Sequence, residues 1–336
     1  MIDYPTAIKR GALAATRLQR DLGIDDDAYA VDTGRVDVFQ AASQLAVPLL
    51  FRPLESLLGA YLSAPIPGIL VTTKRPLSVQ RFTAAHEIGH HALGHKPSLD
   101  DEDVLRRSFL RSFDGDQQEV EANAFAATLL LPRRLLNWHC ARQEWTDELL
   151  HDPQTIYQLS IRVGTSYEAT CWILSRYKVL SWSAAAELAK IQPRKIKEHI
   201  LSGITPANYY GDVWILREQD AGSRIEGGPT DLFVVQIEEH SSAGFLSKAV
   251  YRPEGFQDLG NSRLRRDLNP DQIGGSTLRR LVFQSTEKQE GEIRIVDSRP
   301  WTTEGSTSAS VSYSLLGPET TGISRFEHQR QFPVVN

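Results

Sequence analysis

The sequence HEIGH at residues 86–90 places two imidazoles and a carboxylate at a spacing that suits metal chemistry. A step of four residues turns about 40° around an α-helix, so we expect His86 and His90 on one face, one turn apart. Such an H-E-x-x-H pattern provides two zinc ligands and, in Glu87, a general base. Zinc lowers the pKa of a bound water to about 7, and the carboxylate then takes its proton. The alternative is a surface helix that carries these three residues without a metal.

Two further histidines, His91 and His95, repeat the four-residue spacing but lack the rest of the pattern. The residue after His91 is Ala92, so no carboxylate accompanies this pair, and Gly94 is expected to end the helix. His91 also lies about 140° around the helix from His86. We therefore expect surface or helix-end contacts for His91 and His95, and no part in the metal site.

A catalytic zinc needs a third protein ligand, and the segment EVEANAFAATLLLP at residues 119–132 offers two glutamates. Glu119 and Glu121 are separated by about 200° around a helix, so only one of them can face the histidines. Glu119 shares its face with Asn123, which is placed to hydrogen-bond a ligand histidine. The spacing resembles that of thermolysin-type zinc peptidases. We expect Glu119 to be the ligand, with Glu121 as the alternative.

Two segments together resemble the ImmA/IrrE family of zinc metallopeptidases: RFTAAHEIGHHALGH at residues 81–95 and EVEANAFAATLLLP after it. The shared features are the Arg-Phe-Thr lead-in, the H-E-x-G-H core, the E-x-x-A-N-x-x-A-A block and the closing leucines and proline. With the strands before them, they cover roughly residues 30–135.

This resemblance implies that His86, His90 and Glu119 bind zinc, or manganese in its place, and that Glu87 is the general base. It also implies a substrate class, a DNA-binding repressor of the helix-turn-helix type. Cleavage of that repressor would relieve transcriptional repression in a stress or phage-related response.

The elements that would position this site follow from hydrophobic spacing and from the breakers around it. Residues 5–21 and 35–46 have helical spacing, whereas GAYLS and GILVTTK are predicted as short strands. One helix is expected from Ser78 to Gly94 and another from Glu119 to Pro132, with a charged, loop-like segment between them. Residues 133–200 are predicted to be helical throughout.

Within this helical part, LSIRVGTSYEATCWIL has the rhythm of a helix, a turn with glycine and a second helix. Residues 155–200 carry seven Lys or Arg against three Glu, so DNA binding is one interpretation. The other is a helical extension that packs on the peptidase. We favour packing, because a helix that contacts DNA should not be apolar on all sides.

From about residue 211, short alternating stretches between turns predict an all-β domain, in the manner of a sandwich. It resembles chagasin-type inhibitors of cysteine peptidases in Gly274-Gly275, Phe283, Gly291 and Arg299-Pro300-Trp301. Of the family's first inhibitory loop, HSSAGF at 240–245 keeps only Gly244 and Phe245. We therefore expect a module that binds a protein partner or senses a signal.

The sequence as a whole predicts an α+β fold. The expected parts are a mainly helical zincin-like peptidase domain with a small sheet at 1–140, a helix-turn-helix-like segment at 141–205, an immunoglobulin-like β-sandwich at 211–320, and a poorly ordered polar tail at 321–336. The tail is expected to lose order from Gly317. The alternative to an endopeptidase is a non-catalytic regulatory or binding protein that acts through the β-domain or the basic helices.

Bulk properties limit the location and the partners. The longest apolar stretches are far shorter than the ~20 residues that cross a bilayer, and the N-terminal residues lack the apolar run of a secretion signal. The two cysteines, Cys140 and Cys171, lack metal-site spacing and cannot form a disulfide framework. We expect a cytoplasmic protein without a membrane partner. The net charge of −5 argues against coating of nucleic acid.

Overall fold

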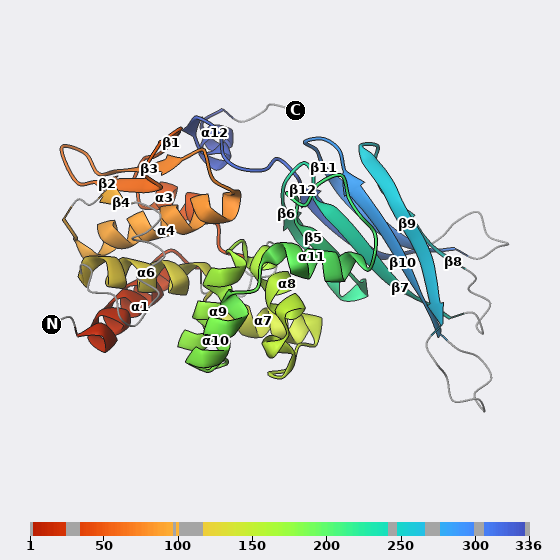
Figure 1. Ribbon diagram of the computed structural model, residues 1–336. Coiled ribbons are helices and arrows are strands. Elements are labelled where there is room, and N and C mark those ends of the chain that lie inside the picture. Colours follow the sequence, from red (N-terminus) through yellow and green to blue (C-terminus); the bar gives the residue numbers. More distant parts are fainter. Residues whose placement is uncertain are drawn as a thin grey trace. The chain divides into compact units, whose positions relative to one another are not determined.

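The computed structural model describes residues 3–24, 34–96, 99–100, 117–240, 247–265, 276–298 and 306–332 (Figure 1). The chain folds into two compact units. Unit 1 contains Met1–His139, Leu159–Lys190 and Pro318–Asn336, and unit 2 contains Cys140–Gln158 and Ile191–Gly317. The residues predicted as one helical segment, 141–205, are thus divided between the units. The predicted α+β fold, with a mainly helical part and an all-β part, is confirmed.

The strands of unit 1 form a five-stranded sheet in the order β13-β1-β3-β2-β4. β1 and β3 are parallel, whereas β2 pairs antiparallel with β3 and β4, and β13 pairs antiparallel with β1. The strands are β1 (Leu49–Arg52), β2 (Gly59–Leu62), β3 (Gly68–Thr72), β4 (Leu99–Asp100) and β13 (Gly322–Ile323). The two strands predicted from GAYLS and GILVTTK are β2 and β3.

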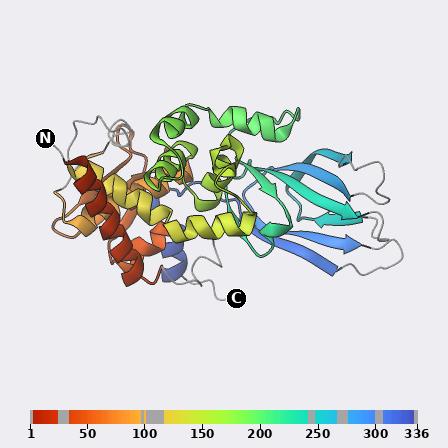
Figure 2. The same ribbon diagram turned by 90° about the horizontal axis from the view of Figure 1, so that it is seen from below.

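Four helices of unit 1 build the layers next to this sheet: α1 (Tyr4–Asp21), α3 (Val38–Gln44), α4 (Leu77–Leu93) and α6 (Gln117–Leu130). The sheet covers one side of α4, α6 covers another, and α1 runs alongside α6 (Figures 1 and 2). Because α4 is covered in this way, every residue from Gln80 to His90 is buried. A helix enclosed on several sides need not be amphipathic, which agrees with its mixed sequence.

Beyond α6 the described chain is helical up to residue 201, as predicted. Its elements are α7 (Arg133–Gln143), the 3₁₀ turn η1 (Leu149–His151), α8 (Pro153–Val163), α9 (Tyr167–Arg176), α10 (Trp182–Ala189) and α11 (Pro193–Leu201). Among the described residues, no helix has both the length and the apolar character that crossing a membrane requires.

The predicted helix-turn-helix shape is present as α8, a turn at Gly164 and α9. Seven of the ten residues of α9 are buried, so this helix lies in the interior of unit 1. At its end, Arg176 Nη1 donates to the backbone oxygen of Asn123 over 3.3 Å, and the hydroxyl of Tyr177 donates to that of Leu131 over 2.6 Å. The position corresponding to a recognition helix is therefore used for packing against α6.

Unit 2 contains two four-stranded sheets, in the orders β5-β7-β10-β9 and β6-β12-β11-β8 (Figure 1). Aromatic rings from both sheets meet between them: Phe233 stacks on Phe283 at 5.6 Å, and Phe256 contacts Tyr313 edge-on at 5.5 Å. The predicted sandwich is confirmed. Its strands are β5 (Val213–Leu216), β6 (Arg224–Glu226), β7 (Leu232–His240), β8 (Ser247–Tyr251), β9 (Phe256–Arg265), β10 (Ser276–Ser285), β11 (Glu290–Ser298) and β12 (Ser306–Ser314), and the turn η2 (Glu218–Asp220) follows β5.

Much of the predicted chagasin-like pattern cannot be placed in this sandwich. Gly274-Gly275, Arg299-Pro300-Trp301 and residues 241–245 of the HSSAGF loop lie outside the described residues. Phe283 lies in the aromatic core, and Gly291 lies beside the ring of Tyr313.

The prediction of a poorly ordered tail from Gly317 is wrong for residues 318–332. β13 pairs with β1, and α12 (Arg325–Gln331) follows it. The backbone N–H of Glu319 donates to Gln80 Oε1 over 2.7 Å, and Gln80 Nε2 donates to the backbone oxygen of Glu319 over 3.1 Å. Ser43 Oγ also donates to Glu327 Oε2 over 2.7 Å. A polar segment gains order here through paired hydrogen bonds rather than through an apolar face.

Truncation after Gly317 should therefore destabilise unit 1, because it removes β13 and leaves the buried Gln80 amide without two of its contacts. An unsatisfied buried polar group costs about 1–3 kcal/mol. Truncation after Phe332 keeps β13 and α12 and serves as the control. Thermal unfolding and hydrogen exchange of the α4 amides measure the effect, and equal protection of α4 in both truncated chains would contradict it.

Candidate metal centre

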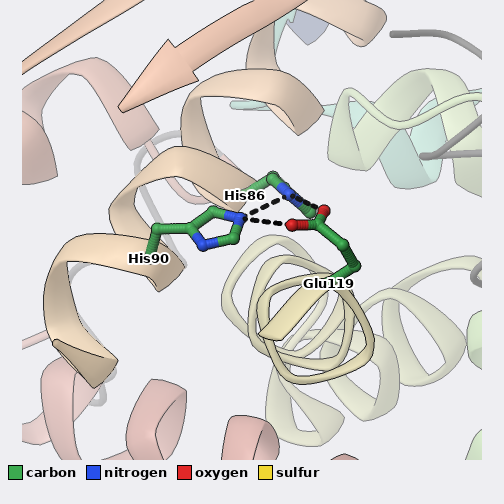
Figure 3. A group of neighbouring side chains, drawn as sticks. All are labelled: His86, His90 and Glu119. Atoms are coloured by element: carbon green, nitrogen blue, oxygen red, sulfur yellow. Dashed lines mark hydrogen bonds and ion pairs between the residues drawn. The ribbon is translucent and has the colours of Figure 1, made fainter. Parts of the chain in front are cut away.

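His86 and His90 project from neighbouring turns of α4 toward α6 (Figure 3). Both side chains are fully buried, and their Nε2 atoms are 2.9 Å apart. Gly89 lies between them and faces α6. An added Cβ at this position would lie 3.1 Å from the ring of Phe125 and 3.2 Å from Ala122 Cα. The missing side chain lets the two helices approach closely enough for groups on α6 to reach the histidines.

Glu119 supplies that group from the first turn of α6 (Figure 3). Its Oε2 lies 3.2 Å from His86 Nε2 and its Oε1 lies 3.5 Å from His90 Nε2. Within the described part of the chain, these three side chains are the group whose arrangement suits a metal ion. The predicted convergence of His86, His90 and Glu119 is therefore present. Glu121, the alternative, points instead toward His95.

A hydrogen bond fixes the orientation of the first imidazole. His86 Nδ1 lies 3.1 Å from Asn123 Oδ1. A carboxamide oxygen only accepts, so Nδ1 carries the proton and Nε2 presents its lone pair toward Glu119. Asn123 thus has the geometry expected from its spacing to Glu119, four residues before it on the same face of α6.

The donor set fits a divalent cation. Two imidazole Nε2 atoms and a carboxylate converge in a buried space, and within the described residues no hydrogen bond reaches either oxygen of Glu119. Burying a carboxylate in this way is costly unless a positive charge faces it. Histidine nitrogen and carboxylate oxygen are ordinary zinc ligands, and a set of three leaves a fourth position open for a reactant.

Glu87 lies on a different face of α4, which is turned toward β2. A Cβ atom at Gly59 of β2 would collide with Thr83 Cγ2 and would lie 2.7 Å from Glu87 Oε1. The carboxylate therefore lies against the strand backbone at the one place where the strand has no side chain. It is fully buried, next in sequence to His86.

The two histidines of the second pair, His91 and His95, lie in different surroundings. His91 is half-buried, and its Nδ1 lies 3.1 Å from the hydroxyl of Tyr61 on β2, in agreement with a helix-end contact. His95 is buried, so the expectation of a surface position is wrong for it, although it does make a contact at the end of the helix. Its Nδ1 lies 3.0 Å from His90 Nδ1, and its Nε2 lies 3.0 Å from Glu121 Oε2. Sequence reasoning thus missed a residue that contacts the site.

The position of His95 could have been predicted from the glycine before it, Gly94. Gly94 ends α4 in the left-handed conformation, with φ of 66°. The N–H of His95 donates to the oxygen of His90 over 3.0 Å, and the N–H of Gly94 donates to that of His91 over 3.2 Å. This is the Schellman motif, in which the second residue after the helix folds back onto the last turn. The motif brings the side chain of His95 to that of His90.

Burial also changes the acid–base properties of these two histidines. Desolvation lowers the pKa of His91 below its ordinary value. It lowers the pKa of His95 as well, where the hydrogen bond and the negative charge of Glu121 oppose the shift. Burial thus favours the neutral imidazole at both positions, and a neutral ring has one nitrogen that accepts.

Comparison with known proteins agrees with this geometry. Two histidines on one helix and a glutamate on the next are the donor arrangement that is typical of metallohydrolase sites with an H-E-x-x-H motif. Residues 42–175 match the model of peptidase family M78, described as the IrrE N-terminal-like domain. This match confirms the predicted resemblance to the ImmA/IrrE family and supports a metallopeptidase of that type. No curated protein matches the chain.

Solved structures give a weak likeness to cysteine peptidase inhibitors. The crystal structure of the cysteine protease inhibitor EhICP2 from Entamoeba histolytica is 16% identical, with a TM-score of 0.29, and the match covers 32% of this chain and 99% of that one. The solution structure of Amebosin is 18% identical, with a TM-score of 0.26, and the match covers 31% and 96%. At these TM-scores the likeness says nothing of what the sandwich does.

The contact between Gly59 and Glu87 can be tested by stability. Gly59→Ala should lower the free energy of unfolding by about 1–3 kcal/mol, because the new methyl group forces the strand, Thr83 or Glu87 to move. Gly68→Ala is the matched control in the same hairpin, since its Cβ would lie 3.7 Å from the Pro48 oxygen, at ordinary contact distance. Thermal unfolding of both variants measures the difference, and equal midpoints would show that Gly59 is not a required close approach.

Proposed function

We propose that this protein is a zinc-dependent endopeptidase that hydrolyses a peptide bond in a protein substrate. The observation that carries the proposal is the buried convergence of the ligand atoms of His86, His90 and Glu119. The family match over residues 42–175 supports a metallopeptidase. The non-catalytic alternative offers no reason for a carboxylate to be buried beside two imidazole lone pairs.

In this proposal His86, His90 and Glu119 hold the metal, which is zinc, with manganese as the alternative. A metal ion there would polarise the scissile carbonyl and make water acidic enough to be deprotonated near neutral pH. Glu87 accepts the proton of the attacking water and delivers it to the leaving amine. Asn123 holds the His86 ring so that Nε2 faces the cluster, which removes the need to reorganise that ligand.

We further propose that the substrate is a DNA-binding repressor of the helix-turn-helix type, cleaved in a stress or phage-related response. The resemblance to the ImmA/IrrE family supports this substrate class. The β-sandwich then serves a protein partner rather than the chemistry, because His86, Glu87, His90 and Glu119 all belong to unit 1. DNA binding through residues 155–200 is not favoured, because α9 is used for packing.

Replacement of the proposed anionic ligand should abolish metal binding. The parent chain should hold one zinc, and Glu119→Gln should weaken zinc binding by at least ~100-fold, because the variant loses the negative charge that balances the cation. Glu187→Gln, at an exposed position on α10, is the control. Metal analysis after dialysis and competition with a chelator measure the effect. Loss of zinc in Glu121→Gln together with retained zinc in Glu119→Gln would identify Glu121 as the ligand instead. A parent chain without stoichiometric zinc or manganese would favour the non-catalytic alternative.

Replacement of the proposed base should separate binding from chemistry. Glu87→Gln should retain zinc and the folded state but lower the cleavage rate by about 10²–10⁴-fold, because the amide accepts no proton. Co-expression with candidate repressors encoded nearby, followed by mass spectrometry of the fragments, provides the assay. Glu187→Gln should cleave like the parent. Cleavage that persists in Glu87→Gln would refute the mechanism, and a set of repressors that all remain intact would refute the substrate class.

A further inference from the structure

A chain of buried polar groups leads away from the metal centre on the side opposite to Glu119. His90 Nδ1 contacts His95 Nδ1, and His95 Nε2 contacts Glu121 Oε2, each at 3.0 Å. Glu121 is 1% exposed. Its other oxygen, Oε1, accepts from Gln117 Nε2 at 2.7 Å and from Arg10 Nη1 at 3.3 Å. The chain thus links α4, the second residue after it, α6 and α1.

The proton positions along this chain of polar groups can be assigned by starting from Glu121. Gln117 and Arg10 both donate to Glu121 Oε1, and an ionised carboxylate only accepts. His95 Nε2 therefore carries a proton and donates it to Glu121. In the neutral ring its Nδ1 is then an acceptor, so the facing Nδ1 of His90 must be the donor. His90 consequently presents an unprotonated Nε2 to the cluster with His86 and Glu119.

We propose that His95 and Glu121 are positioning residues of the metal site: they hold the His90 ring in the tautomer and orientation in which Nε2 binds the metal. This role rests on the proposed metal site and deepens it. Asn123 does the same for His86 by accepting from its Nδ1. The two ligand histidines are thus oriented by different devices, one a carboxamide and the other a histidine held by a buried carboxylate.

The same contacts exclude His95 and Glu121 as ligands of this ion. Both nitrogens of His95 are engaged, one by His90 and the other by Glu121. Glu121 is directed to His95, Gln117 and Arg10. The orientation is therefore supplied by groups outside the cluster, and a hydrogen-bonded partner of a ligand histidine commonly changes metal affinity by about 10–100-fold when it is removed.

The test compares two equivalent substitutions at neighbouring histidines. His95→Phe keeps a ring of similar size but removes both nitrogens, and should weaken zinc binding about 10–100-fold. His91→Phe removes the contact with Tyr61, which does not touch His90, and should bind zinc within about threefold of the parent. Glu121→Gln should weaken zinc binding less than His95→Phe does, because its amide oxygen still accepts. Competition with a chromophoric chelator measures the three affinities.

The tautomer of His90 provides a second readout that does not depend on metal or on cleavage. In the metal-free parent, ring ¹⁵N shifts of labelled histidine, assigned by the loss of signals in His90→Gln, should show the His90 proton on Nδ1. In His95→Phe that proton should move at least partly to Nε2. A general loss of packing would not produce this change in a chain that circular dichroism shows to be folded.

The outcomes separate this inference from the proposed function. If the parent binds zinc and a folded His95→Phe binds it equally well, the positioning role is wrong while the metal site stands. If the parent binds no metal, the proposed function fails, and the proton position in metal-free His90 still decides the inference. If His95→Phe does not fold, Glu121→Leu carries the test, because it removes both oxygens that fix His95. Parental zinc affinity together with an unchanged His90 tautomer in that variant would overturn the proposal.

Discussion

The constraint on which unit 1 depends is the burial of two imidazole Nε2 atoms and a carboxylate that face one another between α4 and α6. A buried carboxylate without a hydrogen-bond donor is unfavourable unless a positive charge faces it, so the surrounding structure must hold it in place. Close helix packing at Gly89 supplies the distance. Asn123 and His95 supply the orientation of the rings. The stability of the fold around α4 and the formation of the metal site are therefore linked in the same contacts.

Two faces of α4 contact different elements of unit 1. The face that carries His86 and His90 meets α6, whereas the face with Thr83, Glu87 and His91 meets β2 at Gly59 and Tyr61. A ligand and a base that are adjacent in sequence point in directions about 100° apart on a helix. In the proposed mechanism this division keeps Glu87 out of the ligand set, so that it remains available for proton transfer.

The convergence of His86, His90 and Glu119 was predictable from sequence because it depends on local spacing on two helices. His86, Glu87 and His90 form one motif, and the azimuths of Glu119 and Glu121 indicated that only one of these two glutamates faces α4. His95 was missed for a different reason. Helical periodicity stops at Gly94, and the position of the next side chain is set by the turn rather than by the helix. The end of α4 at Gly94 was predicted correctly. The position of the His95 side chain could be predicted only by assuming that the helix ends in a Schellman motif.

Three strands that were not predicted individually from the sequence, β8, β9 and β13, lie at the edges of their sheets. β8 and β9 lie at the edges of the two sheets of unit 2, and most of the exposed positions of β9 are polar, so the alternation that marks a half-buried strand is weak. β13 consists of two residues and is defined by its pairing with β1, more than 250 positions away in the chain. Local patterns carry little information about such long-range pairs.

The last part of the chain returns to unit 1 and helps to hold α4, the helix that carries His86 and His90. Residues of unit 2 separate α10 from β13 in sequence, so the peptidase fold is completed by the end of the chain. Gln80, in the first turn of α4, is held by Glu319, and the last turn of α4 is held through His95 by Glu121. Both ends of the helix that carries His86 and His90 are therefore fixed by buried polar contacts to other elements. A metal site gains affinity when its ligands are held before the metal binds. A fragment that stops after the first 140 residues would keep the three proposed ligands and the contact with Glu121, but it would lose the contact that fixes the start of α4.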